Sequence, residues 1–173
     1  MKDKITVVGG GLAGSEAAYY LAKKGYNVRF VDIKPNAYTP AHKSADYGEL
    51  VCSNSLKSND AYGNACGTLK EEMRILDSFV IKCADESRVP AGAALAVDRN
   101  EFSRLITEGL KSWKNIEFIS EEVEKFDLSE NVIIATGPLT TPKLCEFIRS
   151  ITGDGFYFYD AAGGLVLPRP PLR

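Results

Sequence analysis

The hydrophobic pattern at the start of the chain predicts a strand, a helix and a second strand. Residues 5–8 form a short apolar run that ends at a glycine-rich turn, and residues 13–24 have the composition of a helix. Gly25 follows, and glycine is the residue type that most often ends a helix. Residues 27–32 then predict the second strand. This order is typical of a βαβ unit with two parallel strands.

A long amphipathic helix is predicted in the middle of the chain. Thr68 and Glu71 have the spacing of a capping box, and the helical period continues to about residue 85. The apolar positions fall at spacings of three and four, which indicates one buried face. They are Leu69, Met73, Leu76, Val80 and Cys83. The segment before this helix, residues 34–58, has no sustained period and is too long for a simple connection, so we expect it to be functional.

Residues 89–92, which include a proline and a glycine, end that helix, and residues 93–97 predict a short buried strand. Asp98 and Glu101 open a further helix. Its buried stripe consists of Phe102, Leu105, Ile106 and Leu110. We interpret Trp113, which follows, as a hydrophobic plug at the end of this helix.

The last third of the chain returns to strands. Residues 116–119 and 122–126 predict two of them, and residues 131–135 form a continuous β-branched run typical of a central parallel strand. Thr141 and Pro142 open a final helix that ends at about residue 151. The fold class is therefore α/β, with a parallel central sheet and a small antiparallel excursion. We expect one domain over residues 1–162 and an irregular, proline-rich tail over residues 163–173.

The glycine-rich turn has the spacing of a dinucleotide-binding site. In this motif the first glycine permits the tight turn, the second lets the backbone approach a pyrophosphate, and the third allows the helix to pack closely on the strand. The predicted phosphate site consists of Gly9, Gly10, Gly11, Leu12, Ala13 and Gly14. Asp32 ends the second strand, where an acidic residue usually holds a ribose hydroxyl. The alternative is a glycine-rich turn without a ligand.

Composition narrows the class of protein. The chain has 173 residues, 45% of them hydrophobic and 25% charged, as in a globular domain. No apolar run is long enough to span a membrane, and the first strand begins too early to leave room for a signal peptide, so we expect a cytoplasmic protein. A net charge of −2 gives no electrostatic reason to expect nucleic acid.

The cysteines do not suggest a metal site or a disulfide framework. The four of them, Cys52, Cys66, Cys83 and Cys145, are far apart and form no CxxC pair. His42 is the only histidine. We interpret Cys83 as a core residue and Cys66 and Cys145 as structural.

The turn after the last strand points to a class of cofactor. Ala135, Thr136, Gly137 and Pro138 follow residues 131–134 directly. This arrangement resembles the FAD-binding half of two-dinucleotide flavoproteins, a Rossmann-like FAD/NAD(P)-binding domain. The resemblance implies that Thr136, Gly137 and Pro138 lie against the nucleotide and that the backbone of Val123 faces the adenine.

Several longer segments narrow the resemblance further. They are residues 39–42, 49–56, 69–74, 89–92, 95–99, 135–140 and 158–162. The chain resembles, over about residues 4–162, the folate- and FAD-dependent tRNA (uracil-5-)-methyltransferases of bacteria. That resemblance implies transfer of a methylene group from 5,10-methylenetetrahydrofolate to C5 of the T-loop uridine of tRNA. FAD would be the cofactor, NAD(P)H the reductant, and Cys52 a covalent catalyst.

The chemistry of uracil gives a separate reason to consider Cys52. C5 of uracil is a poor nucleophile until a group adds at C6, and a thiolate suits such a reversible addition. Ser53 and Asn54, beside this cysteine, are candidates for stabilising a thiolate or accepting a substrate amide. The alternative for Cys52 is a small residue in a packed loop.

Other candidate substrate residues keep two interpretations open. His42 lies in a segment expected near the flavin or the substrate, or is a solvated loop histidine. Arg99 and Lys70 are candidates for binding phosphate groups or the carboxylates of folate, or are surface charges of their helices.

The chain also departs from the family it resembles. Asp32 stands where the family has a longer glutamate, and Lys34 stands where it has arginine. Family members are more than twice as long, and residues 163–173 do not follow their pattern. We therefore expect a truncated fragment that is inactive alone. The alternative functions are a general FAD or NAD(P) oxidoreductase and a non-catalytic nucleotide-binding remnant.

Overall fold

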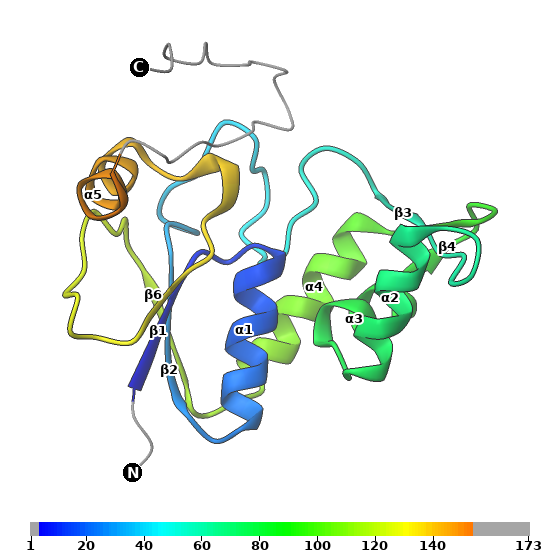
Figure 1. Ribbon diagram of the computed structural model, residues 1–173, viewed down its shortest axis with the longest axis horizontal. Coiled ribbons are helices and arrows are strands. Elements are labelled where there is room, and N and C mark those ends of the chain that lie inside the picture. The colour runs from blue at the N-terminus through cyan, green and yellow to red at the C-terminus, as the bar shows by residue number, and fades with distance from the viewer. Residues whose placement is uncertain (1–3, 154–173) are drawn as a thin grey trace.

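The computed structural model describes residues 4–153, and its elements follow the chain from a parallel sheet to a group of helices and back to the sheet (Figure 1). The strands are β1 (Lys4–Val8), β2 (Asn27–Asp32), β3 (Ser55–Ser58), β4 (Arg88–Val89), β5 (Ala94–Val97), β6 (Ile116–Ser120) and β7 (Val132–Ile134). The helices are α1 (Leu12–Lys23), α2 (Ala65–Ile75), α3 (Phe79–Glu86), α4 (Arg99–Lys111), the short 3₁₀ helix η1 (Gly137–Leu139) and α5 (Pro142–Thr152).

The larger sheet has four parallel strands in the order β6-β2-β1-β7. Helix α1 connects β1 to β2, as the hydrophobic pattern predicts for a βαβ unit. Successive side chains of a strand point to opposite faces. Accordingly, Val7 packs in the main core with α1, whereas Val8 packs with Leu144 and Ile148 of α5. The sheet is thus covered on both faces, and the predicted α/β class is confirmed.

Helices α2, α3 and α4 form a second part of the molecule beside α1, together with a small antiparallel sheet in the order β3-β5-β4 (Figure 1). The side chain of Asp98 accepts hydrogen bonds from the N–H groups of Asn100 and Glu101, which confirms the predicted start of α4. The predicted buried stripe of this helix is also confirmed. Its members Phe102, Ile106 and Leu110 are fully buried, and Leu105 packs against them.

A carboxylate and an aromatic ring of α1 are among its contacts with the second part. Glu16 accepts hydrogen bonds from Ser78 Oγ at 2.8 Å and from the N–H groups of Phe79 at 3.0 Å and Val80 at 2.8 Å. These are donors at the N-terminus of α3, which the helix itself cannot satisfy. Tyr19 stacks on Phe79 with the ring centroids 3.9 Å apart, and Trp113 meets Tyr19 edge-on.

The single helix predicted from Thr68 to about residue 85 is wrong. Asn64 caps α2, the chain leaves the helix at Asp77, where φ is +59°, and Ser78 caps α3. Thr68 instead donates its hydroxyl to the carbonyl groups of Ala61 and Asn64. Because the break rotates the two halves relative to each other, the predicted common face is lost. Leu69 and Leu76 are exposed, whereas Val80 and Cys83 are buried.

Two of the predicted strands also need correction. Residues 122–126 form no strand, because only the first residue of the segment after β6 continues the ladder, through the N–H of Glu121 to the Asp32 carbonyl at 3.0 Å. The apolar run at 131–135 gives the three-residue β7, which lies at the edge of the described sheet and not at its centre. Its Ile133 and Ile134 are each 38% exposed.

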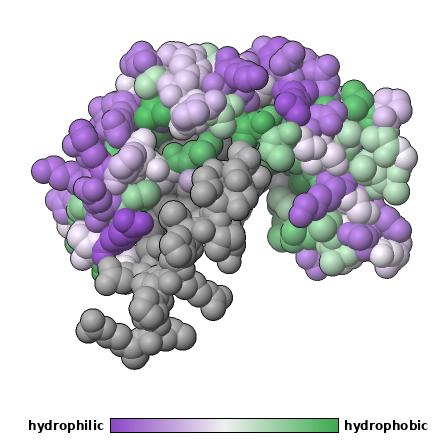
Figure 2. All heavy atoms as spheres, turned by 90° about the horizontal axis from the view of Figure 1, so that it is seen from above, coloured by the Kyte–Doolittle hydropathy of each residue, from purple (hydrophilic) through white to green (hydrophobic). Residues whose placement is uncertain are grey.

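The structure does not extend to the predicted tail. Residues 163–173 and the segment at 158–162 lie outside the described residues. Within residues 4–153, no helix combines the length and the apolar character needed to cross a bilayer. Figure 2 shows the molecule hollowed between its two parts, with hydrophobic residues gathered along the inner side of the hollow.

Candidate functional site

The glycine turn after β1 is packed as a dinucleotide-binding turn requires. Gly9 has a φ of +106°, and a Cβ atom there would lie 2.6 Å from the Ala135 carbonyl oxygen. A Cβ atom at Gly14 would lie 1.8 Å from the Gly9 carbonyl oxygen. Backbone meets backbone at both positions, so a side chain has no room. At Gly11, in contrast, a Cβ atom would meet no heavy atom of the described chain within 4 Å. This glycine opens onto the pocket.

Asp32 fixes the turn from the end of β2. One carboxylate oxygen accepts the Gly10 N–H at 2.5 Å, and the other accepts the Lys34 N–H at 2.9 Å. Each bond involves a charged acceptor, which is stronger than a neutral one. Asp32 therefore already accepts hydrogen bonds from the protein backbone. A ligand hydroxyl would share its oxygens with these two N–H groups.

A pocket lies between this turn, the end of β2 and the segment after β7. Several of the residues predicted from sequence line it together: Gly9, Gly10, Gly11, Asp32, His42, Val123 and Thr136. Other predicted residues do not line it: Leu12, Ala13, Gly14, Gly137 and Pro138. The lining also includes residues that were not among the predicted site residues, such as Lys34, Thr39, Thr140 and Leu144. Only one residue separates Lys34 from Asp32, which ends a predicted strand. This position could have indicated that Lys34 lies near the pocket.

His42 is a titratable side chain of the loop that lines this pocket. Its Nδ1 atom lies 2.6 Å from Thr39 Oγ1. Burial lowers the pKa of His42 below its usual value of 6.5, and the nearby Lys34 ammonium lowers it further. The neutral imidazole therefore predominates at pH 7. This geometry supports the interpretation of His42 as a pocket residue.

The Cys52 segment lies apart from the pocket lining. Cys52 is exposed, and Arg99 donates from Nη2 to its carbonyl oxygen at 3.4 Å. Asn54 is tied to β5, because its side-chain amide donates to the Val97 carbonyl and its own carbonyl accepts the Val97 N–H. The structure therefore groups Cys52, Ser53, Asn54 and Arg99 as a second cluster at the start of α4. None of these four residues is among those that line the pocket.

The remaining cysteines occupy different surroundings. Burial raises the pKa of the Cys83 thiol to about 12, in agreement with its predicted place in the core. Burial also raises the pKa of Cys145. Lys70, interpreted as a surface charge, is buried and donates to the carbonyl groups of Ser58 and Cys66, so that interpretation is wrong. Within residues 4–153, no group of three acidic, cysteine or histidine side chains could hold a metal ion.

Comparisons with known proteins agree with the resemblance seen in the sequence. The chain is 54% identical over 167 residues to methylenetetrahydrofolate--tRNA-(uracil-5-)-methyltransferase TrmFO of Fusobacterium nucleatum, covering 96% of this chain and 38% of the relative. It is 55% identical over 163 residues to the protein of the same name from Staphylococcus carnosus, covering 94% of this chain and 37% of the relative. The chain thus spans less than two fifths of the length of these relatives.

Solved structures of lower identity share the fold. p-Nitrophenol 4-monooxygenase PnpA of Pseudomonas putida matches 88% of this chain and 44% of its own with a TM-score of 0.55 and 15% identity. The Diels-Alderase PyrE3 matches 88% of this chain and 35% of its own with a TM-score of 0.53 and 12% identity. The profile of the family described as glucose inhibited division protein A matches residues 4–161. The chain therefore belongs to the glucose inhibited division protein A family.

Proposed function

We propose that this protein acts in FAD-dependent transfer of a one-carbon group from 5,10-methylenetetrahydrofolate to C5 of the T-loop uridine of tRNA, with NAD(P)H as reductant. The observation that supports this most is identity of 54% to a relative named as such a methyltransferase, over 96% of the chain. Because the chain spans 38% of that relative, the proposal assigns its described residues two parts of the reaction. These parts are nucleotide binding and a thiol nucleophile.

The residues of the pocket fit the FAD that this function requires. Gly11 leaves space where a side chain would stand, and it precedes the first turn of α1, whose N–H groups have no partner within the helix. Such a helix start favours a pyrophosphate. Thr136 and Val123 also line the pocket, and the proposal assigns the nucleoside to them. When bound, FAD would supply two-electron chemistry between NAD(P)H and the one-carbon group.

The proposed role of Cys52 is to make C5 of uracil nucleophilic. Addition of its thiolate to C6 forms an S–C6 bond and moves the electron pair of the C5–C6 double bond toward O4 as an enolate. C5 then bonds to the one-carbon unit, whose bond to the tetrahydrofolate nitrogen breaks and leaves its electron pair, with a proton, on that nitrogen. Loss of the C5 proton and departure of the thiolate restore the double bond, and a hydride that originates from NAD(P)H completes the methyl group. The exposure of Cys52 supports this role, because the base must reach the sulfur.

A stable adduct tests this role. In tRNA with 5-fluorouridine in the T-loop, C5 carries fluorine in place of the proton that must leave, so the thiol cannot be released. In an intact, full-length enzyme that contains these residues, with FAD, NAD(P)H and 5,10-methylenetetrahydrofolate present, we expect peptide mass spectrometry to find the nucleotide on Cys52, and we expect the Cys52→Ala variant to form no adduct. Cys145→Ala is the matched control, since Cys145 is half-buried on α5, and it should form the adduct normally. An adduct on another residue that persists in Cys52→Ala would contradict the proposal.

A further inference from the structure

The side chain of Lys34 is buried between the nucleotide pocket and the loop that leads to Cys52. It is 4% exposed, although an ammonium group is costly to bury without partners. Its Nζ donates to the Asp46 carbonyl oxygen and lies 3.9 Å from Glu49 Oε2. It also lies 5.8 Å from the ring centroid of Tyr47. Every one of these partners belongs to residues 46–49.

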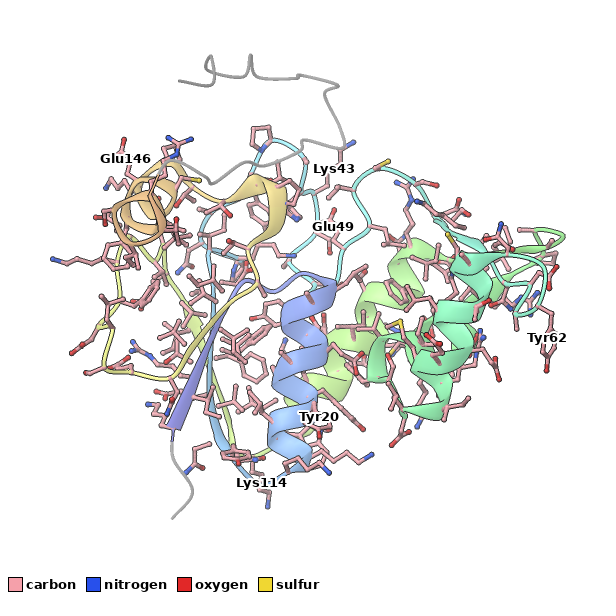
Figure 3. All side chains as sticks on the ribbon, viewed as in Figure 1. Tyr20, Lys43, Glu49, Tyr62, Lys114 and Glu146 are labelled. Atoms are coloured by element: carbon pink, nitrogen blue, oxygen red, sulfur yellow. The ribbon has the colours of Figure 1, made fainter. Side chains whose placement is uncertain are left out.

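Residues 46–49 also form hydrogen bonds with other parts of the chain. The Gly48 N–H donates to the Gly10 carbonyl oxygen at 2.8 Å, so this segment touches the glycine turn directly. The Tyr47 N–H donates to Thr107 Oγ1 at 2.8 Å. The Glu49 carboxylate accepts the backbone N–H groups of Lys43 and Ser44. Figure 3 shows Lys43 and Glu49 together at one end of the sheet and Lys114 at the opposite end.

The solvent exposure of the chain increases directly after this segment. Glu49 is largely buried, with 14% of its side chain exposed, whereas residues 51–54 are all exposed. Cys52 is only three residues from Glu49. Leu50 packs against the core between Glu49 and Cys52, and the contact of Lys34 with Glu49 is the last ion pair before the exposed thiol. Lys34 also lines the pocket proposed for the nucleotide. It therefore contacts both this pocket and the segment that leads to Cys52.

We propose that Lys34 is a positioning residue, which holds residues 46–49 against the nucleotide site and thereby fixes where the Cys52 thiol is presented. The importance of this for catalysis rests on the proposed function of Cys52. The charge of Lys34 offsets the buried Glu49 carboxylate, and its hydrogen bond to Asp46 sets the path of the backbone. Without it, residues 46–52 open more often while the core remains folded.

The test measures amide hydrogen exchange by peptide mass spectrometry in the folded chain. The N–H groups of Tyr47 and Gly48 are hydrogen-bonded, so they exchange only when their segment opens. In Lys34→Met we expect these amides to exchange about tenfold faster, since a hydrogen bond from a charged group is strong enough to shift a local opening equilibrium by an order of magnitude. The amides of α3 around buried Cys83 should stay protected, which shows that the core is intact. Lys114→Met, an exposed lysine at the other end of the sheet, is the control and should leave both rates unchanged.

A double variant decides whether Lys34 positions the loop or only neutralises Glu49. Lys34→Met/Glu49→Gln removes both charges, so no buried charge is left unpaired. Faster exchange of the Tyr47 and Gly48 amides in this variant, with α3 protected, supports positioning, including the case in which Lys34→Met alone unprotects α3. An unchanged exchange rate of these amides in Lys34→Met, or a return to the wild-type rate in the double variant, overturns it. The readout needs no tRNA, so failure here leaves the adduct test of Cys52 intact, and the reverse also holds.

Discussion

At the scale of single residues, Asp32 and Gly10 show how the protein uses a nucleotide-site motif for its own backbone. Asp32 accepts two backbone N–H groups, one of them from Gly10. A Cβ atom at Gly10 would lie 2.5 Å from the Tyr47 ring and 2.9 Å from the Asp32 carboxylate. The shorter acid at position 32 therefore has a structural role that does not depend on a ribose.

His42 gives a prediction on pH. Because burial and the Lys34 ammonium lower its pKa, we expect its NMR titration midpoint below 6.5. The unfolded chain then binds the proton more readily than the folded one. The free energy of unfolding should therefore fall as the pH drops from about 6.5 to the folded midpoint. His42→Gln should lose that part of the pH dependence, and a midpoint above 6.5 would show that the imidazole is not desolvated.

Sequence could identify the residues of the glycine turn and could place Lys34 near Asp32, but it could not show that Lys34 is buried. The spacing of Gly9, Gly11 and Gly14 reflects close approach of backbone segments that are neighbours in the βαβ unit, so it is visible in the sequence. The burial of Lys34 depends on the path of residues 34–58, which have no period. Its distance from Glu49, fifteen residues along the chain, is fixed only in three dimensions.

At the scale of elements, α3 depends on a carboxylate from α1. Glu16→Ala removes the acceptor of three hydrogen bonds at the start of α3 and leaves two buried N–H groups without it. We expect the free energy of unfolding to fall by about 1–3 kcal/mol. Urea denaturation measures this, with the exposed Glu72→Ala of α2 as the control. Equal stability of the two variants would show that solvent replaces Glu16 without cost.

The same contact explains why the break between α2 and α3 was missed. Spacings of three and four continue across residues 69–83, so the hydrophobic pattern shows one helix. The break is made by Asp77 in the left-handed region and by Ser78 and Glu16, which satisfy the new N-terminus. Glu16 lies more than sixty residues away in sequence, so no local pattern contains this information. Helix α4, which begins at the local cap Asp98, was predicted correctly.

At the scale of the whole molecule, the long segment between β2 and β3 connects the two chemical parts of the site. It leaves the sheet at Asp32, passes the pocket at His42, contacts the glycine turn at Gly48 and reaches β3 after Cys52. Its last part is tied to β5 through Asn54. The nucleotide pocket and the thiol are therefore carried by different parts of the fold and linked by one continuous loop.

The most direct test of this account is whether the chain binds FAD at the glycine turn. The backbone of Gly11 has a φ of −76°, which valine adopts without strain, and a Cβ atom there meets no described atom within 4 Å. Gly11→Val should therefore leave the unfolding temperature unchanged. Calorimetric titration should show FAD binding to the wild type, and a dissociation constant about 5- to 150-fold higher for Gly11→Val, the range that an overpacking cost of about 1–3 kcal/mol gives.

Ala65→Val, at an exposed alanine at the start of α2, is the control for that titration and should bind FAD as the wild type does. The account predicts loss of affinity in the Gly11 variant alone, at equal thermal stability of all three proteins. Absence of FAD binding by the wild type, or equal affinity of wild type and Gly11→Val, would contradict it.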